Sequence, residues 1–198
     1  MPFDFFLPLL LALPPAAALQ PVDPAHWPGP LLEVAAALQS RGPFQIPYRQ
    51  ERFVAGLKRP LLSHGVFHRD ADSAIRFEQQ SPFPRSLRIS GSGISETQPG
   101  GPDRRVHAPF VQAATAPLLA LFSGDLSRAA RNFDARWSGG VPGWVLELSP
   151  KGTAAGIFSS LRAEGDSGIR RVEVREGRDG LTRLHFGAAF PDSPPEGR

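Results

Sequence analysis

Apolar and polar residues alternate along the chain with a period that changes several times, and each change predicts a new element. Near the beginning, apolar residues recur at i, i+3, i+4 and i+7 from Leu31 to Leu38, which is the spacing of one helix face. Pro30 occupies a first helical position and Gly42 follows as a stop. This segment therefore predicts an amphipathic helix over about 31–40.

Period-two alternation begins at Phe44 and is typical of a half-buried strand. Further stretches of strand-like composition are separated by breaks rich in Gly, Pro and Asp. They lie at 61–69, 73–80 and 85–90 and, later, at 144–148, 157–163, 169–176 and 181–186. Short turns such as Asp179-Gly180 connect sequential strands. This order predicts an antiparallel sheet.

The middle of the chain is predicted to be helical. Pro109 opens a stretch that continues through Pro117 to Phe122, and helical spacing resumes from Leu126 to Phe133. The fold class is therefore α+β, with one helix at the start and a helical insert in the middle covering one face of the sheet. We find no internal repeat or linker, so we predict a single domain over 19–187 and a disordered tail over 188–198.

The first 18 residues have the composition of an export signal. Phe5 to Ala18 is an apolar stretch that ends in three alanines, which fits the small-x-small rule for signal-peptidase cleavage. Asp4 is the one charge ahead of it, where such signals normally carry Lys or Arg. A helix packed in the core is the alternative, but Pro8, Pro14 and Pro15 would interrupt it. We predict a cleaved signal peptide over 1–18 and a periplasmic location.

Composition excludes several function classes. The sequence has no Cys, which removes disulfides, thiol nucleophiles and cysteine-ligated metals. The net charge is +3, and all but two of the 22 basic residues (Lys58 and Lys151) are Arg. These arginines are scattered and form no dense basic stripe, so we expect no nucleic-acid partner.

Catalytic and cofactor motifs are also missing. The sequence has no P-loop, no nucleophile elbow and no dinucleotide-binding glycine pattern ahead of a helix. His64 and His68 could share one strand face, but the sequence places no third metal ligand beside them. We therefore expect no enzyme activity, no metal and no cofactor. A hydrolase with Ser, His and Asp assembled in space stays open as an alternative.

Three blocks of residues, in order along most of the chain, carry a resemblance to a known family. They are Phe53-x3-Leu57-Lys58-x-Pro60-Leu61-x-Ser63-x-Gly65, then Leu118-x2-Leu121-x2-Gly124-Asp125-Leu126 with Phe133, then Trp144-x-Leu146-x-Leu148-x-Pro150-Lys151 with Ile157, Arg171-Val172-Glu173-Val174 and Gly180-x-Thr182. In this order they resemble the LolA family of periplasmic lipoprotein carriers, in its divergent LolA-like branch. The resemblance covers about residues 31–187.

The resemblance implies a fold and a function. LolA-like proteins fold as an unclosed, strongly curved antiparallel β-barrel (a half-barrel) whose concave side is apolar. An N-terminal helix and a mid-chain helical insert cover that side as a lid. The implied function is a soluble, monomeric carrier that shields the acyl chains of a lipoprotein or another lipid between the inner and outer membranes. An inner-membrane donor complex and an outer-membrane acceptor are the implied protein partners.

The apolar members of the alternating strands and the inward faces of the mid-chain helices are the predicted lipid-binding residues. They are Phe53, Leu57, Phe67, Ile75, Phe77, Leu87, Ile89, Phe110, Leu118, Leu121, Phe122, Trp144, Leu146 and Leu148. Each of them would equally serve as core packing between lid and sheet.

One departure from the family concerns the lid. In the family an Arg-Pro pair shortly after the Gly-opened strand holds the lid, because the Arg donates hydrogen bonds to helix backbone. Counted from Gly65, the matching positions here hold Ala71 and Asp72, and Arg69, two residues earlier, could take the role of that Arg only if the loop is shifted. Two readings of the function are open. One is a lipid carrier, and the other is a non-transporting lipid-sensing or protein-binding module on the same fold.

Overall fold

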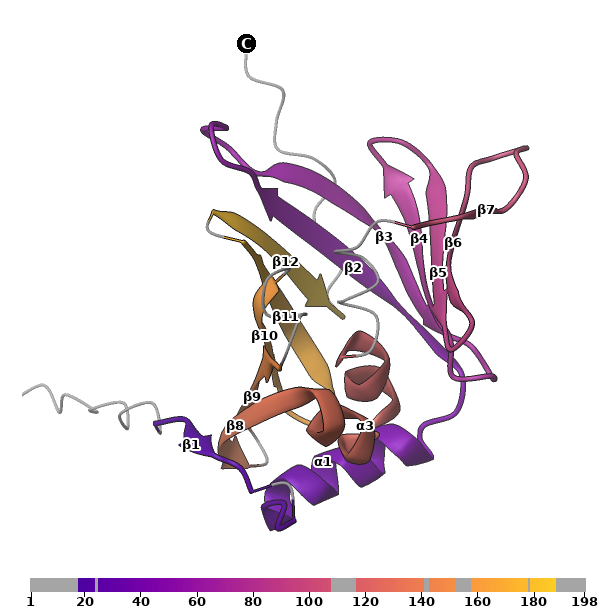
Figure 1. The fold of residues 1–198 in the computed structure, drawn as a ribbon. Coiled ribbons are helices and arrows are strands. Elements are labelled where there is room, and N and C mark those ends of the chain that lie inside the picture. Colours follow the sequence, from indigo (N-terminus) through magenta and orange to yellow (C-terminus); the bar gives the residue numbers. More distant parts are fainter. Residues whose placement is uncertain are drawn as a thin grey trace, which may run out of the picture.

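The stretches of period two form one antiparallel sheet in the computed structural model (Figure 1). The structure describes residues 18–187 except 24, 108–116, 141–142, 152–157 and 178. The predicted signal peptide (apart from Ala18) and the predicted tail over 188–198 lie outside the described residues. The strands are β1 (Gln20–Pro21), β2 (Phe44–Phe53), β3 (Leu61–Arg69), β4 (Ile75–Ser81), β5 (Arg85–Ser90), β6 (Gly93–Thr97), β7 (Arg104–Arg105), β8 (Phe133–Gly140), β9 (Gly143–Pro150), β10 (Phe158–Gly165), β11 (Ile169–Glu176) and β12 (Gly180–Phe186).

The sheet is strongly curved and does not close. Its order is β1-β8-β9-β10-β11-β12-β2-β3-β4-β5-β6-β7, and every neighbouring pair is antiparallel. In the described part of the chain the edge strands β1 and β7 do not pair with each other. The predicted class, an α+β half-barrel, is confirmed.

The helices lie within the curve of the sheet and across one end of it (Figure 1). They are α1 (Gly29–Ser40), the helical residues 117–123, and α3 (Leu126–Asn132). Helix α1 begins with Pro in its first turn, as the sequence predicts. The other helical prediction runs one residue too far, because the helix ends at Asn132 and Phe133 begins β8. None of the described helices is long and apolar enough to cross a membrane.

Four strands were not predicted from the sequence. Strands β1 and β7 have two residues each and are too short to give a pattern. In β6, Ile94 alone is fully buried, so alternation is weak. In β8, buried Phe133, Ala135 and Trp137 alternate with exposed residues, but Phe133 also fits the preceding helical period, which hides the strand.

The concave face of the sheet carries the core. Tyr48 of β2 lies opposite Gly65 of β3, and its ring packs edge-on against Phe77 with 5.3 Å between ring centroids. Gly65 has no room for a side chain, since a Cβ there would lie 1.9 Å from the carbonyl oxygen of Glu78. This close approach coincides with the register shift between His64 and Gly65 in the pairing of β3 with β4. We call the concave side of the sheet the trough.

Candidate functional site

The floor of the trough is an aromatic cluster centred on Phe67. Its ring is fully buried and lies 5.1 Å from Phe77, 5.3 Å from Phe186 and 4.4 Å from Phe122 (centroid distances). Phe122 belongs to the helical residues 117–123, whereas the other three belong to strands. The cluster therefore joins the mid-chain helix to the sheet through apolar contacts.

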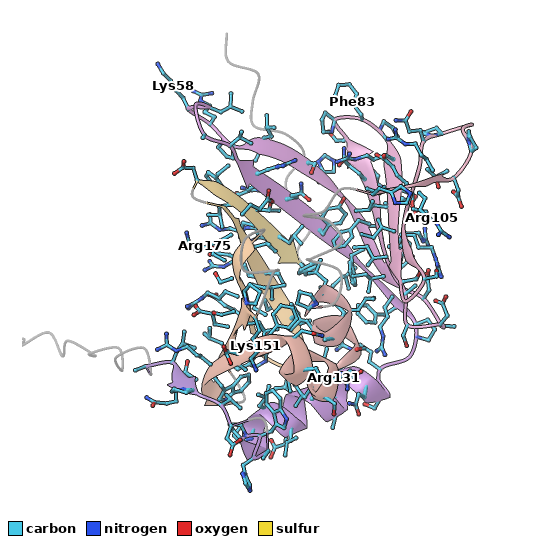
Figure 2. All side chains as sticks on the ribbon, viewed as in Figure 1. Lys58, Phe83, Arg105, Arg131, Lys151 and Arg175 are labelled. Carbon is cyan, nitrogen blue, oxygen red and sulfur yellow. The ribbon has the colours of Figure 1, made fainter. Side chains whose placement is uncertain are left out.

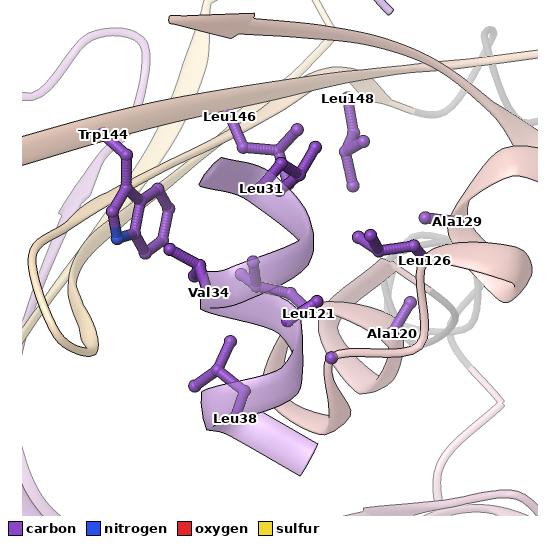
Figure 3. A pocket seen from close by; sticks show the side chains of 12 residues that line it. Leu31, Val34, Leu38, Ala120, Leu121, Leu126, Ala129, Trp144, Leu146 and Leu148 are labelled. Carbon is purple, nitrogen blue, oxygen red and sulfur yellow. The ribbon is translucent and has the colours of Figure 1, made fainter. Parts of the chain in front are cut away.

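An apolar cavity lies between the helices and strand β9 (Figure 3). Its walls are formed by apolar side chains from all three helical segments and from β9. The lining residues are Leu31, Val34, Ala35, Leu38, Ala120, Leu121, Gly124, Leu126, Ala129, Trp144, Leu146 and Leu148. Its volume is about 20 Å³, which is room for a water molecule and not for an acyl chain. In this conformation the side chains of the helices occupy the trough.

Arg69 fastens the end of α1 to the sheet. Its guanidinium nitrogen Nη1 donates hydrogen bonds of 2.6 Å to the carbonyl of Leu38 and of 2.6 Å to the carbonyl of Arg41. The last carbonyls of a helix have no intrahelical partner, and a cation there also interacts favourably with the helix dipole. Arg69 is a buried residue, so these bonds form largely out of water.

Arg69, two residues before the matching position, therefore makes the hydrogen bonds to helix backbone that the resemblance assigns to the family's Arg. Ala71 is exposed in the turn after β3. Asp72, in the same turn, accepts a hydrogen bond from the amide of Ala74 and forms an ion pair with Arg88, so it takes no part in the latch. Arg69 reaches the helix because it lies on the concave side of β3, in register with Ile75 of β4.

A second polar contact joins α1 to the mid-chain helices. The side-chain amide of Gln39 donates a 2.8 Å hydrogen bond to the carbonyl of Gly124. Gly124 has φ +69°, and a Cβ there would lie 2.4 Å from the carbonyl oxygen of Ala35. Glycine at this position therefore permits the close approach of the two helical segments.

Most of the predicted lipid-binding residues lie in this layer between helices and sheet. They are buried or packed against the buried core: Phe67, Ile75, Phe77, Leu87, Ile89, Leu118, Leu121, Phe122, Trp144, Leu146 and Leu148. Four of them, Leu121, Trp144, Leu146 and Leu148, line the cavity itself. The structure brings these residues together, and whether they touch lipid stays a prediction.

Three predicted residues are not placed in the trough. Phe53 lies on the convex face of β2, on the same side as Glu51 and on the opposite side from Tyr48, and the Arg183 guanidinium stacks on its ring at 5.3 Å. Leu57 lies in the turn after β2 and is exposed. Phe110 lies outside the described residues.

Other residues of the layer were absent from the prediction. Leu31, Val34 and Leu38 of α1 line the cavity, and Phe186 of β12 completes the aromatic cluster. The helical spacing of the first three already marked one apolar face, so assigning the α1 face to the trough would have found them. Arg69 was identified from the sequence as a substitute for the family's Arg only on the condition that the loop is shifted, and its contact depends on where α1 ends.

The convex face of the described strands carries a network of paired charges. Arg183 donates to Glu173 at 2.8 Å and to Glu51 at 3.2 Å, and its bond to Glu173 raises the pKa of the guanidinium. Burial favours a higher pKa for Glu51, but hydrogen bonds from Arg49 and Arg183 outweigh it and lower that pKa. Burial is the main cause that lowers the pKa of His185 nearby. These groups pair with one another across neighbouring strands and stabilise the sheet.

His64 and His68 lie on this convex side of β3, opposite Arg49 and Gln45 of β2. His68 Nε2 lies 3.2 Å from a carboxylate oxygen of Glu78. Among the described residues no group of three or more His, Asp or Glu side chains is arranged to hold a metal ion. The site described above is therefore apolar, with polar groups that position helices.

Comparison with known proteins gives remote similarities of structure. No family model and no curated protein matches the chain. The solved structures that it resembles include the MucA/MucB complex of Pseudomonas aeruginosa, at 17% identity and a TM-score of 0.43. That similarity covers 82% of this chain, which spans only 57% of the length of the chain it matches.

Two further structures are similar at the same level. A LolA superfamily protein from Nitrosomonas europaea has 12% identity and a TM-score of 0.43, with 83% of this chain and 93% of that chain covered. A DUF1329 family protein from Desulfovibrio piger has 10% identity and a TM-score of 0.43, with 79% and 88% covered. Similarity at this level does not assign the chain to any of these families.

Proposed function

We propose that this protein is a periplasmic carrier that shields the acyl chains of a lipoprotein or another lipid between its helices and the concave face of its sheet. One observation carries the proposal: the helices rest on the sheet through apolar side chains around an almost filled cavity. An acyl chain that entered this layer would break apolar contacts between helices and sheet, and would form apolar contacts with both.

The energetic argument favours a lipid occupant. Each methylene removed from water contributes about 0.8 kcal/mol, so a chain of ~15 methylenes gains about 12 kcal/mol on burial. Opening the layer breaks the hydrogen bonds from Arg69 and Gln39, each of which contributes about 1–3 kcal/mol. The gain exceeds that cost, and the exposed helix faces would then pack against the acyl chain.

The mode of action that we propose needs no catalytic group, metal or cofactor. The lipid would enter from an inner-membrane donor, travel in the closed trough of a monomer and leave at an outer-membrane acceptor. The predicted signal peptide over 1–18 supports the periplasmic location. Burial in the trough would supply the binding energy for the acyl chains. The donor and the acceptor would set the direction of lipid transfer.

A second function is favoured by the small size of the cavity. With about 20 Å³ of free volume and Phe67, Phe122 and Phe186 in contact, the trough is already full. A module whose helices never leave the sheet would use its outer surface to bind a protein and would carry nothing. The two functions differ in one measurable property, which is whether an acyl chain reaches the layer.

The deciding experiment begins with native mass spectrometry of the protein purified from the periplasm of its own host, followed by lipid extraction. A bound acylated species at one-to-one stoichiometry is the expected result. An apo mass, together with no binding of a fluorescent fatty acid, would overturn the carrier proposal in favour of the binding module.

Trp144 offers a direct test of where the chain binds, because its ring forms part of the cavity wall (Figure 3). A brominated fatty acid quenches tryptophan on contact, so we expect quenching in the native protein and less of it in Trp144→Phe, where Trp137, stacked at 5.7 Å in the native protein, remains. Leu31 and Leu32 provide a matched pair on α1, since the first is buried in the cavity wall and the second is exposed. Leu31→Glu should abolish quenching, and Leu32→Glu should preserve it.

A further inference from the structure

Two turns at one edge of the sheet expose apolar side chains that the trough does not use. The first turn joins β2 to β3 and contains residues 54–60. Around it, Leu57 is 52% exposed and Leu61 is 55% exposed, and Val54 and Leu62 are also exposed. The second turn joins β4 to β5, and its Phe83 is 76% exposed. Large apolar side chains so exposed in a group mark a contact surface.

The topology places both turns at the same edge. Strands β2 and β4 both run antiparallel to β3, so they point the same way and end at the same side of the sheet. The first turn projects beyond its neighbours, because β4 pairs with β3 only from His64 onward and β12 reaches no further along β2 than Phe53. Figure 2 shows Lys58 and Phe83 at the end of the molecule opposite α1. We call this end of the strands, made of residues 54–62 and 82–84, the tip edge; it is not one of the edge strands.

Positive charge accompanies the exposed apolar residues. Lys58 and Arg59 follow Leu57 directly, and within the described part of the chain neither has an ion-pair partner. Residues 54–62 and 82–84 contain no Asp or Glu. Of the carboxylates on adjoining turns and strands, Glu176 pairs with Arg52 and Glu96 pairs with Arg85 and Arg104. Asp179, exposed in the β11–β12 turn, adds one negative charge at the same end, against the two positive charges of Lys58 and Arg59. Asp103 accepts a hydrogen bond from Thr97.

We propose that the tip edge docks on the surface of an anionic lipid bilayer, with Leu57 and Phe83 inserted among the headgroups and Lys58 and Arg59 beside the phosphates. Two separate, convex tips with flanking cations fit a bilayer, because lipids rearrange around a protruding side chain. A protein partner would need two pockets at a fixed spacing. Apolar insertion combined with attraction to anionic lipid is the general basis of interfacial binding.

The proposal adds to the carrier function and does not depend on it. The tip edge lies at the opposite end of the molecule from α1 and the cavity. In a protein docked in this way, the β2–β3 and β4–β5 turns would lie in the membrane surface. The lid helices would lie away from it. Docking and acyl-chain binding can therefore be tested separately.

The test is sedimentation of the full chain with vesicles of phosphatidylcholine alone and of phosphatidylcholine with phosphatidylglycerol. We expect binding to the anionic vesicles that weakens with salt, and at least tenfold weaker binding to the neutral ones. The double variant Leu57→Ser/Phe83→Ser should lose at least tenfold in affinity. Lys58→Gln/Arg59→Gln should lose about fivefold for each charge removed.

A control variant is available in the same chain. Leu32 of α1 is 48% exposed, close to the value for Leu57, but lies at the other end of the molecule, so Leu32→Ser should bind vesicles as the native protein does. As a second readout, Phe83→Trp should shift its fluorescence to the blue with anionic vesicles and be quenched by brominated lipid.

Three results would overturn the proposal. They are no vesicle binding at any composition, equal binding to neutral and anionic vesicles, and binding that the tip variants leave unchanged. Each tip variant is also titrated with the fluorescent fatty acid, where unchanged affinity is expected. A failure of docking with intact fatty-acid binding rejects this inference alone, and the converse result rejects the carrier function alone.

Discussion

The guanidinium of Arg69, at the end of β3, donates a 2.6 Å hydrogen bond to the carbonyl of Leu38 in the last turn of α1. The same nitrogen reaches the carbonyl of Arg41 just beyond the helix. Two residues 31 positions apart in sequence are thus joined where the helix layer meets the rim of the sheet. Any motion that separates α1 from this rim must break both bonds.

Arg69→Leu should loosen α1 and lower the stability of the protein. Hydrogen bonds from a charged donor contribute about 1.5–3 kcal/mol, and the leucine cannot replace them. We expect a loss of about 2 kcal/mol in the free energy of unfolding, or a fall in Tm of about 4–8 °C for a domain of this size. Amide hydrogen exchange near the C-terminal end of α1 should become faster.

Arg76→Leu is the matched control for this prediction. Arg76 lies on the neighbouring strand β4, but it forms partly exposed ion pairs with Glu78 at 3.0 Å and with Asp70 at 3.7 Å. Surface pairs of this kind contribute about 0–1 kcal/mol, so exchange in α1 should stay as in the native protein. Equal exchange rates in α1 for both variants would contradict the latch.

Gly124→Ala should separate the helical segments. A Cβ at this position would lie 2.4 Å from the carbonyl oxygen of Ala35, and the residue has φ +69°. The backbone conformation alone costs an L-residue about 1 kcal/mol, and the clash adds to that cost. Gly56→Ala is the control, because Gly56 also has positive φ (+85°) but meets nothing within 4 Å. Thermal unfolding should show a markedly larger loss for Gly124→Ala, and equal losses would show that the close approach contributes nothing.

Phe122→Ala should create space between the lid and the floor of the trough. The Phe122 ring lies 4.4 Å from Phe67 and 5.4 Å from Phe186, and it is almost fully buried. Removing a buried Phe side chain costs about 3–5 kcal/mol, which urea denaturation measures. If the layer accepts acyl chains, the new space should raise the affinity for a fluorescent fatty acid. A folded variant with unchanged or weaker affinity would count against acyl binding in this layer.

The sequence was sufficient for the fold class because two periodicities, one helical and one of period two, alternate along it. The floor residues Phe67, Phe77 and Ile89 were predicted correctly as inward-facing, since each sits in a strand with a clear alternation. Phe53 lies on the convex face because it is five residues, an odd number, from Tyr48, so it belongs to the other set of alternating residues in β2. The alternation of Phe44, Ile46 and Tyr48 already indicates this, and the inward assignment of Phe53 did not follow it.

The contact of Arg69 with helix backbone could be predicted from the sequence only on the condition that the loop is shifted. Arg69 is one of 20 arginines, and its sequence context resembles that of an ordinary strand end. Its role follows from the length of α1, which brings the carbonyls of Leu38 and Arg41 to the rim. Counting residues from Gly65 with the family's spacing leads to Ala71 and Asp72, because such a count assumes that the strand and loop have the same lengths as in the family.

Tyr48 gives a prediction for the dependence of stability on pH. Burial raises the pKa of its phenol to about 12, and the positive charge of Arg85 opposes this only in part. The unfolded chain ionises this group near the ordinary tyrosine pKa of 10.0, so the unfolded state loses the proton first as the pH rises. Stability from Tyr48 is therefore complete below about pH 10 and is lost progressively up to about pH 12, by an amount on the order of 2–3 kcal/mol.

Tyr48 is the single tyrosine of the chain, so the ultraviolet absorbance of tyrosinate reports on it alone. In the folded protein we expect this absorbance to appear well above pH 10, and the free energy of unfolding to fall over the same range. Tyr48→Phe keeps the ring against Phe77 and removes the hydroxyl, so its unfolding free energy should lose this component of the alkaline decline. Tyrosinate with a midpoint near pH 10 in a protein that is still folded would show that the phenol is open to water. The wall of the trough at β2 would then be solvated, and the apolar layer would end short of this residue.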